Sequence, residues 1–205
     1  MDYSQPTSQE VLDLTAKALN EHGFETIVVD TKEDALAKIK ELIPRGASVM
    51  NGSSRTLQEI GYLAYLQTGT HGWNNLHEAI LAEKDPEKQS VLRKQSVLSD
   101  FYLGSVHAIS QTGEMVIASA SGSQLPHIAF TSPNIIFVAG AQKIAPTLQD
   151  AMARVQEYVF PLEDQRMKDA GAPGSIFAKE FIFRREPAKM GRKVRMILVK
   201  EKLGF

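Results

Sequence analysis

Residues 24–60 read FETIVVDTKEDALAKIKELIPRGASVMNGSSRTLQEI and set the fold class. Phe24–Val29 is a short β-branched run of the kind that forms a strand. A helix is predicted to begin at Thr31 and to end at Pro44-Arg45-Gly46. Ala47–Met50 is a second apolar strand, and a second helix follows it. Because strands and helices alternate, the sequence predicts crossover connections and a mostly parallel sheet with helices on both faces.

The remainder of the chain extends this α/β pattern. Strands are predicted at Val106–Ser110, Met115–Ala120, Asn134–Ala139 and Arg195–Lys200, and a helix at Pro146–Tyr158 with its proline in the first turn. Asn134–Ala139 is apolar throughout, which is typical of a strand buried on both faces. We expect one domain over residues 1–205.

Residues 69–99 depart from the pattern and are predicted to form a helical insertion of one or two helices outside the main sheet. The insertion contains apolar side chains that need a cover, namely Trp73, Leu76, Ile80, Val91 and Leu98. A two-fold dimer is the commonest way to provide one. The sequence therefore predicts a homodimer.

Composition excludes several classes of function. The chain of 205 residues contains no cysteine, which rules out disulfides, a Cys-ligated zinc, an iron–sulfur cluster and a Cys nucleophile. Its 23 basic and 24 acidic residues give a net charge of −1, so we expect no nucleic-acid partner. Apolar runs fall far short of the roughly 20 residues that span a bilayer. With no export signal in MDYSQPTSQE, a cytoplasmic protein without membrane contact is expected.

Known cofactor and metal motifs are absent from the sequence. It has neither a phosphate-binding P-loop nor a GxGxxG fingerprint, and its five histidines follow no metal-ligand spacing. We therefore expect no cofactor and no metal site. Only His127, beside a Gly-Ser loop, lies close to a predicted site, although a buried structural role suits it as well.

The first candidate site is the loop that follows the strand at Ala47–Met50. A glycine, hydroxyl side chains and a helix start succeed one another there, in Asn51, Gly52, Ser53, Ser54, Arg55 and Thr56. At the carboxyl edge of a parallel sheet, a helix N-terminus with free N–H groups favours an anion. Alternatively, Thr56 is simply an N-cap that Glu59 completes as a capping box; the two interpretations are compatible.

Later polar turns supply further candidates. Thr112, Gly113 and Glu114 form one turn, whose carboxylate is a candidate base or nucleophile or else a solvated hairpin residue. Gly122, Ser123 and Gln124 form a second loop that suits a charged ligand or has no ligand at all. Lys143 follows the strand at Asn134–Ala139 and faces either a ligand or solvent.

Taken together, these segments resemble the LUD domain, which is named for lactate utilisation. The resemblance covers residues 10–160 and rests on a series of matching pieces: Asn51-Gly52-Ser53-Ser54, Glu59-Ile60-Gly61, Ser99 to Ile109, Thr112-Gly113-Glu114, Gly122 to Pro126, and Ile136 to Ile144. It implies a three-layer α/β/α fold similar to ribose-5-phosphate isomerase, glucosamine-6-phosphate deaminase and CoA transferases. It also implies that Asp100 and Glu114 lie at the ligand-binding edge as hydrogen-bond acceptors or in proton transfer.

Two classes of function follow from the residues and the resemblance. The first is a protein that binds a small anionic metabolite, either a carboxylate or a phosphorylated compound, in lactate or organic-acid utilisation. The second is a non-catalytic subunit or scaffold of a lactate-oxidising complex, with oxidoreductase subunits as partners. CoA transfer through Glu114 ranks below both. Some relatives carry cysteines in the stretch that matches residues 165–180, and their absence here argues against a cluster-linked redox role.

Overall fold

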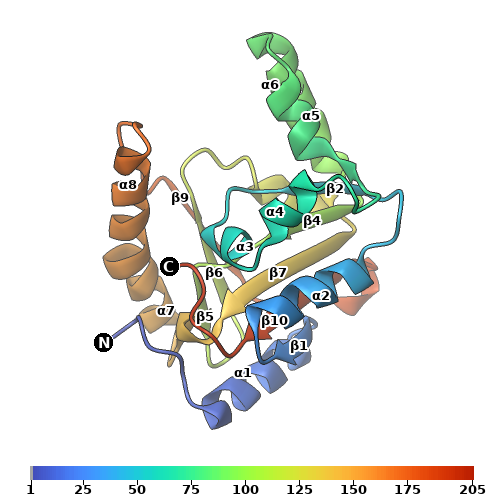
Figure 1. Cartoon of the computed structure of the whole chain (residues 1–205). Helices are drawn as coiled ribbons and strands as arrows, with labels where there is room; N and C mark the ends of the chain where they lie inside the picture. Colours follow the sequence, from blue (N-terminus) through green and yellow to red (C-terminus); the bar gives the residue numbers. More distant parts are fainter. Residues whose placement is uncertain (1) are drawn as a thin grey trace.

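The computed structural model describes residues 2–205, and a parallel sheet of six strands forms its centre (Figure 1). The strand order is β1 (Glu25–Val29), β10 (Lys193–Val199), β7 (Asn134–Gly140), β4 (Phe101–Gly104), β2 (Ser48–Asn51) and β3 (Asn74–Asn75). Every pair of neighbours runs parallel. This confirms the predicted sheet, with β2 and β7 as interior strands.

Strand β7 shows why the central strands are apolar throughout. Ile135 and Phe137 point into one buried cluster, whereas Ile136 and Val138 point into a second cluster on the opposite face. Successive side chains of a strand alternate between faces, so a strand covered on both sides needs apolar residues at every position.

Helices cover both faces of this sheet, as the α/β/α prediction requires. Helices α2 (Lys32–Leu42), α3 (Arg55–Glu59) and α4 (Tyr62–Gln67) lie on one face, and α1 (Gln9–Glu21) lies on the other. Thr31 caps α2 through the predicted capping box, in which its hydroxyl accepts the backbone N–H of Asp34.

A second sheet shares the face of α1, and this layer was not predicted. Its order is β8 (Ile144–Ala145), β5 (Ala108–Ser110), β6 (Met115–Ser119) and β9 (Lys179–Phe183), with antiparallel pairing of β5–β6 and β6–β9. Ile109 and Met115 pack into the same cluster as Leu19 of α1. The two strands expected around residues 106–120 are therefore present but belong to a sheet of their own. Strand β9 was not predicted, and neither was β4 of the parallel sheet.

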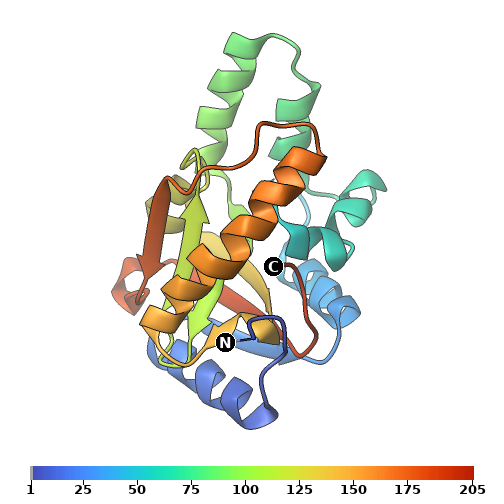
Figure 2. The same ribbon diagram turned by 90° about the vertical axis from the view of Figure 1, so that its left-hand side faces the viewer.

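A long helical segment packs on the outer face of the second sheet (Figure 2). It consists of α7 (Leu148–Arg154), a π-helical turn (Val155–Val159) and α8 (Phe160–Asp169). The predicted helix at Pro146–Tyr158 is thus too short, and Thr147 rather than Pro146 marks its start as the N-cap. The π turn ends two residues before Pro161, whose ring and missing N–H disturb a regular helix.

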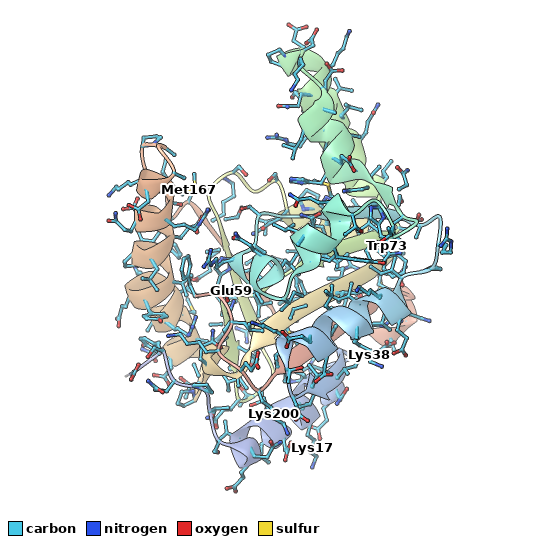
Figure 3. The ribbon with its side chains drawn as sticks, in the orientation of Figure 1. Lys17, Lys38, Glu59, Trp73, Met167 and Lys200 are labelled. Atoms are coloured by element: carbon cyan, nitrogen blue, oxygen red, sulfur yellow. The ribbon has the colours of Figure 1, made fainter. Side chains whose placement is uncertain are left out.

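Helices α5 (Leu76–Ala82) and α6 (Pro86–Gln95) project from the body as an arm (Figure 1). They confirm the expected helices outside the main sheet, and every residue of α6 is exposed or half-buried. Trp73 was expected there too, but it belongs to the core beside α4, and its Nε1 donates to the Ile43 carbonyl at 3.2 Å (Figure 3). Within residues 2–205, no helix is both long and apolar enough to cross a bilayer.

Candidate functional site

The candidate site is a cavity of about 520 Å³ at the carboxyl edge of the parallel sheet. Loops that follow the neighbouring strands β2, β4 and β7 form one side, and the helical segment from the π turn to α8 forms the other. In Figure 3, the labelled Glu59 marks α3 on the first side and Met167 marks α8 on the second. This edge is where ligands bind in open α/β sheets, and the volume is typical of small-molecule sites.

Lys143 connects the three loops at the floor of the cavity. Its Nζ donates to Thr56 Oγ1 after β2 at 3.0 Å, to Ser105 Oγ after β4 at 3.0 Å and to the Val106 carbonyl at 3.1 Å. The side chain is 4% exposed and lines the cavity. All three ammonium protons therefore have neutral acceptors, and no Asp or Glu of the described chain forms an ion pair with it.

A second buried cation lies behind Lys143. Arg154 of α7 is fully buried and donates to the His107 carbonyl and to the Tyr3 carbonyl, while its Nε has no partner within residues 2–205. Burial, followed by the charge of Arg154, lowers the pKa of Lys143 to about 7. The nearby carboxylate of Glu59 opposes this shift only in part. Two buried cations whose hydrogen-bond partners are all neutral are costly, because buried charges are normally paired. An anion in the cavity would offset that cost.

His107 adds a neutral imidazole to the same wall. Its Nδ1 accepts the backbone N–H of Ala118 at 3.1 Å, which leaves the proton on Nε2. Burial and the nearby charges of Lys143 and Arg154 lower the pKa of His107 to about 3. The ring is therefore neutral at physiological pH and acts as an N–H donor.

Asn51 and Gly52 form the part of the wall that follows β2. Asn51 is 2% exposed, and its Oδ1 has no hydrogen-bond partner among residues 2–205. Gly52 is not needed for a left-handed backbone conformation, because it is not one of the described glycines with positive φ. It is needed for space instead, since a Cβ there would lie 2.7 Å from the Tyr102 hydroxyl.

The helix after this loop differs from the prediction. Ser54, rather than Thr56, is the N-cap, and its hydroxyl accepts the Leu57 N–H at 3.2 Å. Thr56 is buried against Lys143, and Glu59 pairs with Arg55 at 2.8 Å instead of completing a capping box. Because α3 has only five residues, its dipole adds little, and the positive charge of the site comes from side chains.

The charged residues that line the cavity are mostly basic. They are Arg55, Arg93, Lys143 and Arg166, against Glu163 alone. Arg55 and Arg166 form ion pairs, with Glu59 at 2.8 Å and Glu163 at 2.7 Å. Lys143 and Arg93 form none with the residues that the structure describes. The arrangement therefore favours a negatively charged ligand.

The family model described as the LUD domain matches residues 12–175. The chain belongs to the LUD domain family. Its fold is similar to the crystal structure of a DUF162 family protein from Deinococcus radiodurans, DUF162 being the former name of the LUD domain. That similarity has a TM-score of 0.56 at 12% sequence identity and covers 95% of this chain and 98% of that chain. No curated protein matches the sequence.

Membership of the LUD domain family supports a role related to lactate utilisation. It confirms the resemblance drawn from the sequence motifs, and the similarity to the solved structure confirms the fold.

Asp100, expected at the ligand-binding edge, lies at the opposite edge of the sheet. It precedes β4, where its carboxylate accepts the backbone N–H of Ser48 at 2.8 Å and the Ser48 hydroxyl at 2.7 Å. These hydrogen bonds lower the pKa of Asp100. In a parallel sheet the residue before a strand and the residue after it lie at opposite edges. Asp100 therefore links the start of β4 to the start of β2, and it does not line the cavity.

Glu114 is also remote from the cavity. It belongs to the turn between β5 and β6, where it accepts hydrogen bonds from the hydroxyls of Ser110 and Thr112. Burial raises the pKa of Glu114, but these hydrogen bonds outweigh it and leave the pKa below its usual value. Gly113, at φ +96°, packs against the α1 backbone at Ala18. Thr112, Gly113 and Glu114 therefore form a structural turn beneath α1.

The glycine- and serine-rich loop does reach the cavity. Ser123 and Gln124 line it, whereas Gly122 packs against the Lys179 side chain. The structure thus brings the residues from Asn51 to Thr56 together with Ser123, Gln124 and Lys143, and it separates them from Asp100 and from the turn at Thr112–Glu114.

Sequence reasoning missed Ser105, His107 and Arg154. Ser105 directly follows β4, so the rule that polar residues after a parallel strand line a site would have found it. His107 was assigned to a strand, and Arg154 lies inside a helix, where only the packing reveals that it is buried. His127 lines the cavity, stacks on Tyr102 with ring centroids 4.5 Å apart and bonds Ser132 Oγ at 2.9 Å, so it also has a structural role.

The described residues form no cluster of side chains that is suited to a metal ion. Among residues 2–205, no three His, Asp or Glu side chains lie close enough together to hold an ion.

Proposed function

We propose that this LUD domain protein binds a small anionic metabolite in the cavity, with Lys143 as the main positive charge that attracts the anion. The observation that carries the proposal is the buried ammonium of Lys143, which has neutral acceptors and a cationic neighbour, Arg154. An anion beside Nζ would offset the desolvation of both charges. Asn51, Ser123 and Gln124 supply polar groups that orient the ligand, and Arg93 adds positive charge at the rim.

The test measures the melting temperature with inorganic phosphate, acetate or L-lactate at millimolar concentration. A ligand that binds only the native state raises the melting temperature as its concentration exceeds Kd. We expect a rise for the unmodified protein and none for Lys143→Met, each compared with its own ligand-free melt. If no anion shifts the melt of the unmodified protein, the proposal is wrong.

Arg93 and Lys94 offer a matched pair of exposed cations on α6. Arg93 lines the cavity and Lys94 does not. We expect Arg93→Gln to weaken the anion-dependent shift and Lys94→Gln to leave it unchanged. Equal effects of the two variants would indicate general surface charge instead of a site.

A second candidate function is that of a subunit that docks on a lactate-oxidising partner. The arm favours it, because Val91 of α6 is 50% exposed on a helix that projects from the body, and Leu98, three residues after α6, is 75% exposed. CoA transfer through Glu114 has less support, since that carboxylate is held in a turn away from the cavity.

A further inference from the structure

The cavity has two chemically different halves. Loops after β2, β4 and β7 form a polar half with Lys143 at its floor. The helical segment and the loop after α8 form a mostly apolar half. It consists of Val155, Val159, Phe160, Met167, Ile176 and Phe177, together with the ion-paired Glu163 and Arg166 and with Ser175. A ligand that fills the cavity therefore contacts mainly hydrogen-bonding groups at one end and mainly hydrocarbon at the other.

Two large apolar side chains at the rim are exposed to solvent. Ile176, in the loop after α8, is 70% exposed, and Leu81 of α5 is 59% exposed, and both line the cavity. Exposed apolar side chains that gather around a cavity mark a surface that is covered when a partner or ligand binds. A three-carbon acid is small compared with a cavity of about 520 Å³ and leaves most of this lining uncovered.

We propose that the ligand is an amphipathic monoanion, with its carboxylate at Lys143 and an unbranched acyl chain of six to ten carbons along the apolar half. This inference rests on the proposed function and adds the chemical class of the ligand. A phosphorylated sugar fits less well, because most side chains of this half are apolar and its hydroxyl groups would lose water against them. An acyl chain instead removes Ile176 and Leu81 from water.

The size of the expected effect follows from the hydrophobic effect. Burial of one CH₂ group contributes about 0.8 kcal/mol, which corresponds to about a fourfold decrease in Kd. Each two-carbon extension that enters the apolar half should therefore tighten binding by about 16-fold. A carboxylate that binds only through its head group would show no such dependence.

The experiment measures Kd by calorimetry for acetate, butanoate, hexanoate and octanoate at pH 6.5, where Lys143 is largely protonated. We expect Kd to fall steeply from butanoate to octanoate, and hexan-1-ol to bind at least tenfold more weakly than hexanoate. If all four carboxylates bind equally, the acyl-chain inference is wrong while the anion site stands. If no anion binds, including phosphate, both proposals fail.

Rim variants locate the chain within the cavity. We expect Leu81→Asn and Ile176→Asn to reduce the tightening from butanoate to octanoate while leaving acetate binding unchanged. Both side chains are exposed, so the variants should fold. Leu98→Asn is the matched control, because Leu98, three residues after the end of α6, is 75% exposed but does not line the cavity. A chain-length dependence that survives both rim substitutions would contradict this placement.

Discussion

At the scale of single residues, Lys143 decides the character of the site. Its Nζ joins the loops after β2 and β4 through Thr56 and Ser105, and burial moves its pKa to about 7. Such a group changes charge near physiological pH, which an exposed lysine does not. The affinity for an anion and the stability of the fold should therefore both respond to pH through this one side chain.

We predict that the free energy of unfolding of the unmodified protein, measured relative to that of Lys143→Met, increases as the pH rises from about 7 to about 10. Below pH 7 the amine is charged in both the native and the unfolded state. Between the native pKa of about 7 and the unfolded value of roughly 10.4, the unfolded state binds more protons, so the free energy of unfolding increases with pH.

Urea unfolding of both proteins at pH 6, 8 and 9.5 measures this difference. A stability gap that does not change with pH would show that Lys143 keeps an ordinary pKa. Phosphate binding should weaken over the same pH range, because the ammonium that attracts the anion is lost.

At the scale of elements, glycine and proline shape the helices that flank the cavity. The single helix expected after Ser54 is divided into α3 and α4 by Gly61, which has φ +79°. On the far side, Pro161 follows the π turn at Val155–Val159, and both Val155 and Val159 line the cavity. Local backbone chemistry therefore sets the outline of the site on both sides.

We predict that Gly61→Ala lowers the free energy of unfolding by about 1–2 kcal/mol, the usual cost of a left-handed conformation for a residue with a Cβ. Space is not the cause, since the added Cβ would lie at an ordinary 3.7 Å from Leu36 Cδ2. Urea unfolding measures the loss. Gly61→Asn should cost less, because asparagine tolerates this region, and an alanine variant as stable as the parent would contradict the argument.

At the scale of the whole molecule, the arm of α5 and α6 stands apart from the body. Ile80 anchors it in the body, while α6 consists of exposed and half-buried residues. A helix with so little burial is expected to open easily and to exchange its amide hydrogens quickly. An interface that covers its apolar side chains would give it the contacts that the body does not provide.

We predict a homodimer formed through this arm. Light scattering at micromolar concentration should give about twice the chain mass of 22.6 kDa. Val91→Asp places a charge on the apolar side of α6 and should shift the protein to a monomer, whereas Lys94→Gln should not. A monomer mass for the unmodified protein would exclude the dimer at these concentrations.

The sequence by itself determined the parallel sheet, its interior strands β2 and β7 and the loops at its carboxyl edge. Those features are local, because apolar periodicity, caps and turn residues within a few positions specify them. It also placed Lys143 just after β7, since the position of a strand end can be predicted without the rest of the fold.

Only the tertiary structure decided which of those polar residues meet. Asp100 and Glu114 were expected beside the loop at Asn51–Thr56, but strand direction places Asp100 at the other edge, and strand pairing places Glu114 in a separate sheet. The burial of Arg154 and the apolar half of the cavity arise when α7 and α8 pack across the sheet. Such contacts join residues up to 151 positions apart, as between Arg154 and Tyr3, and a local pattern does not encode them.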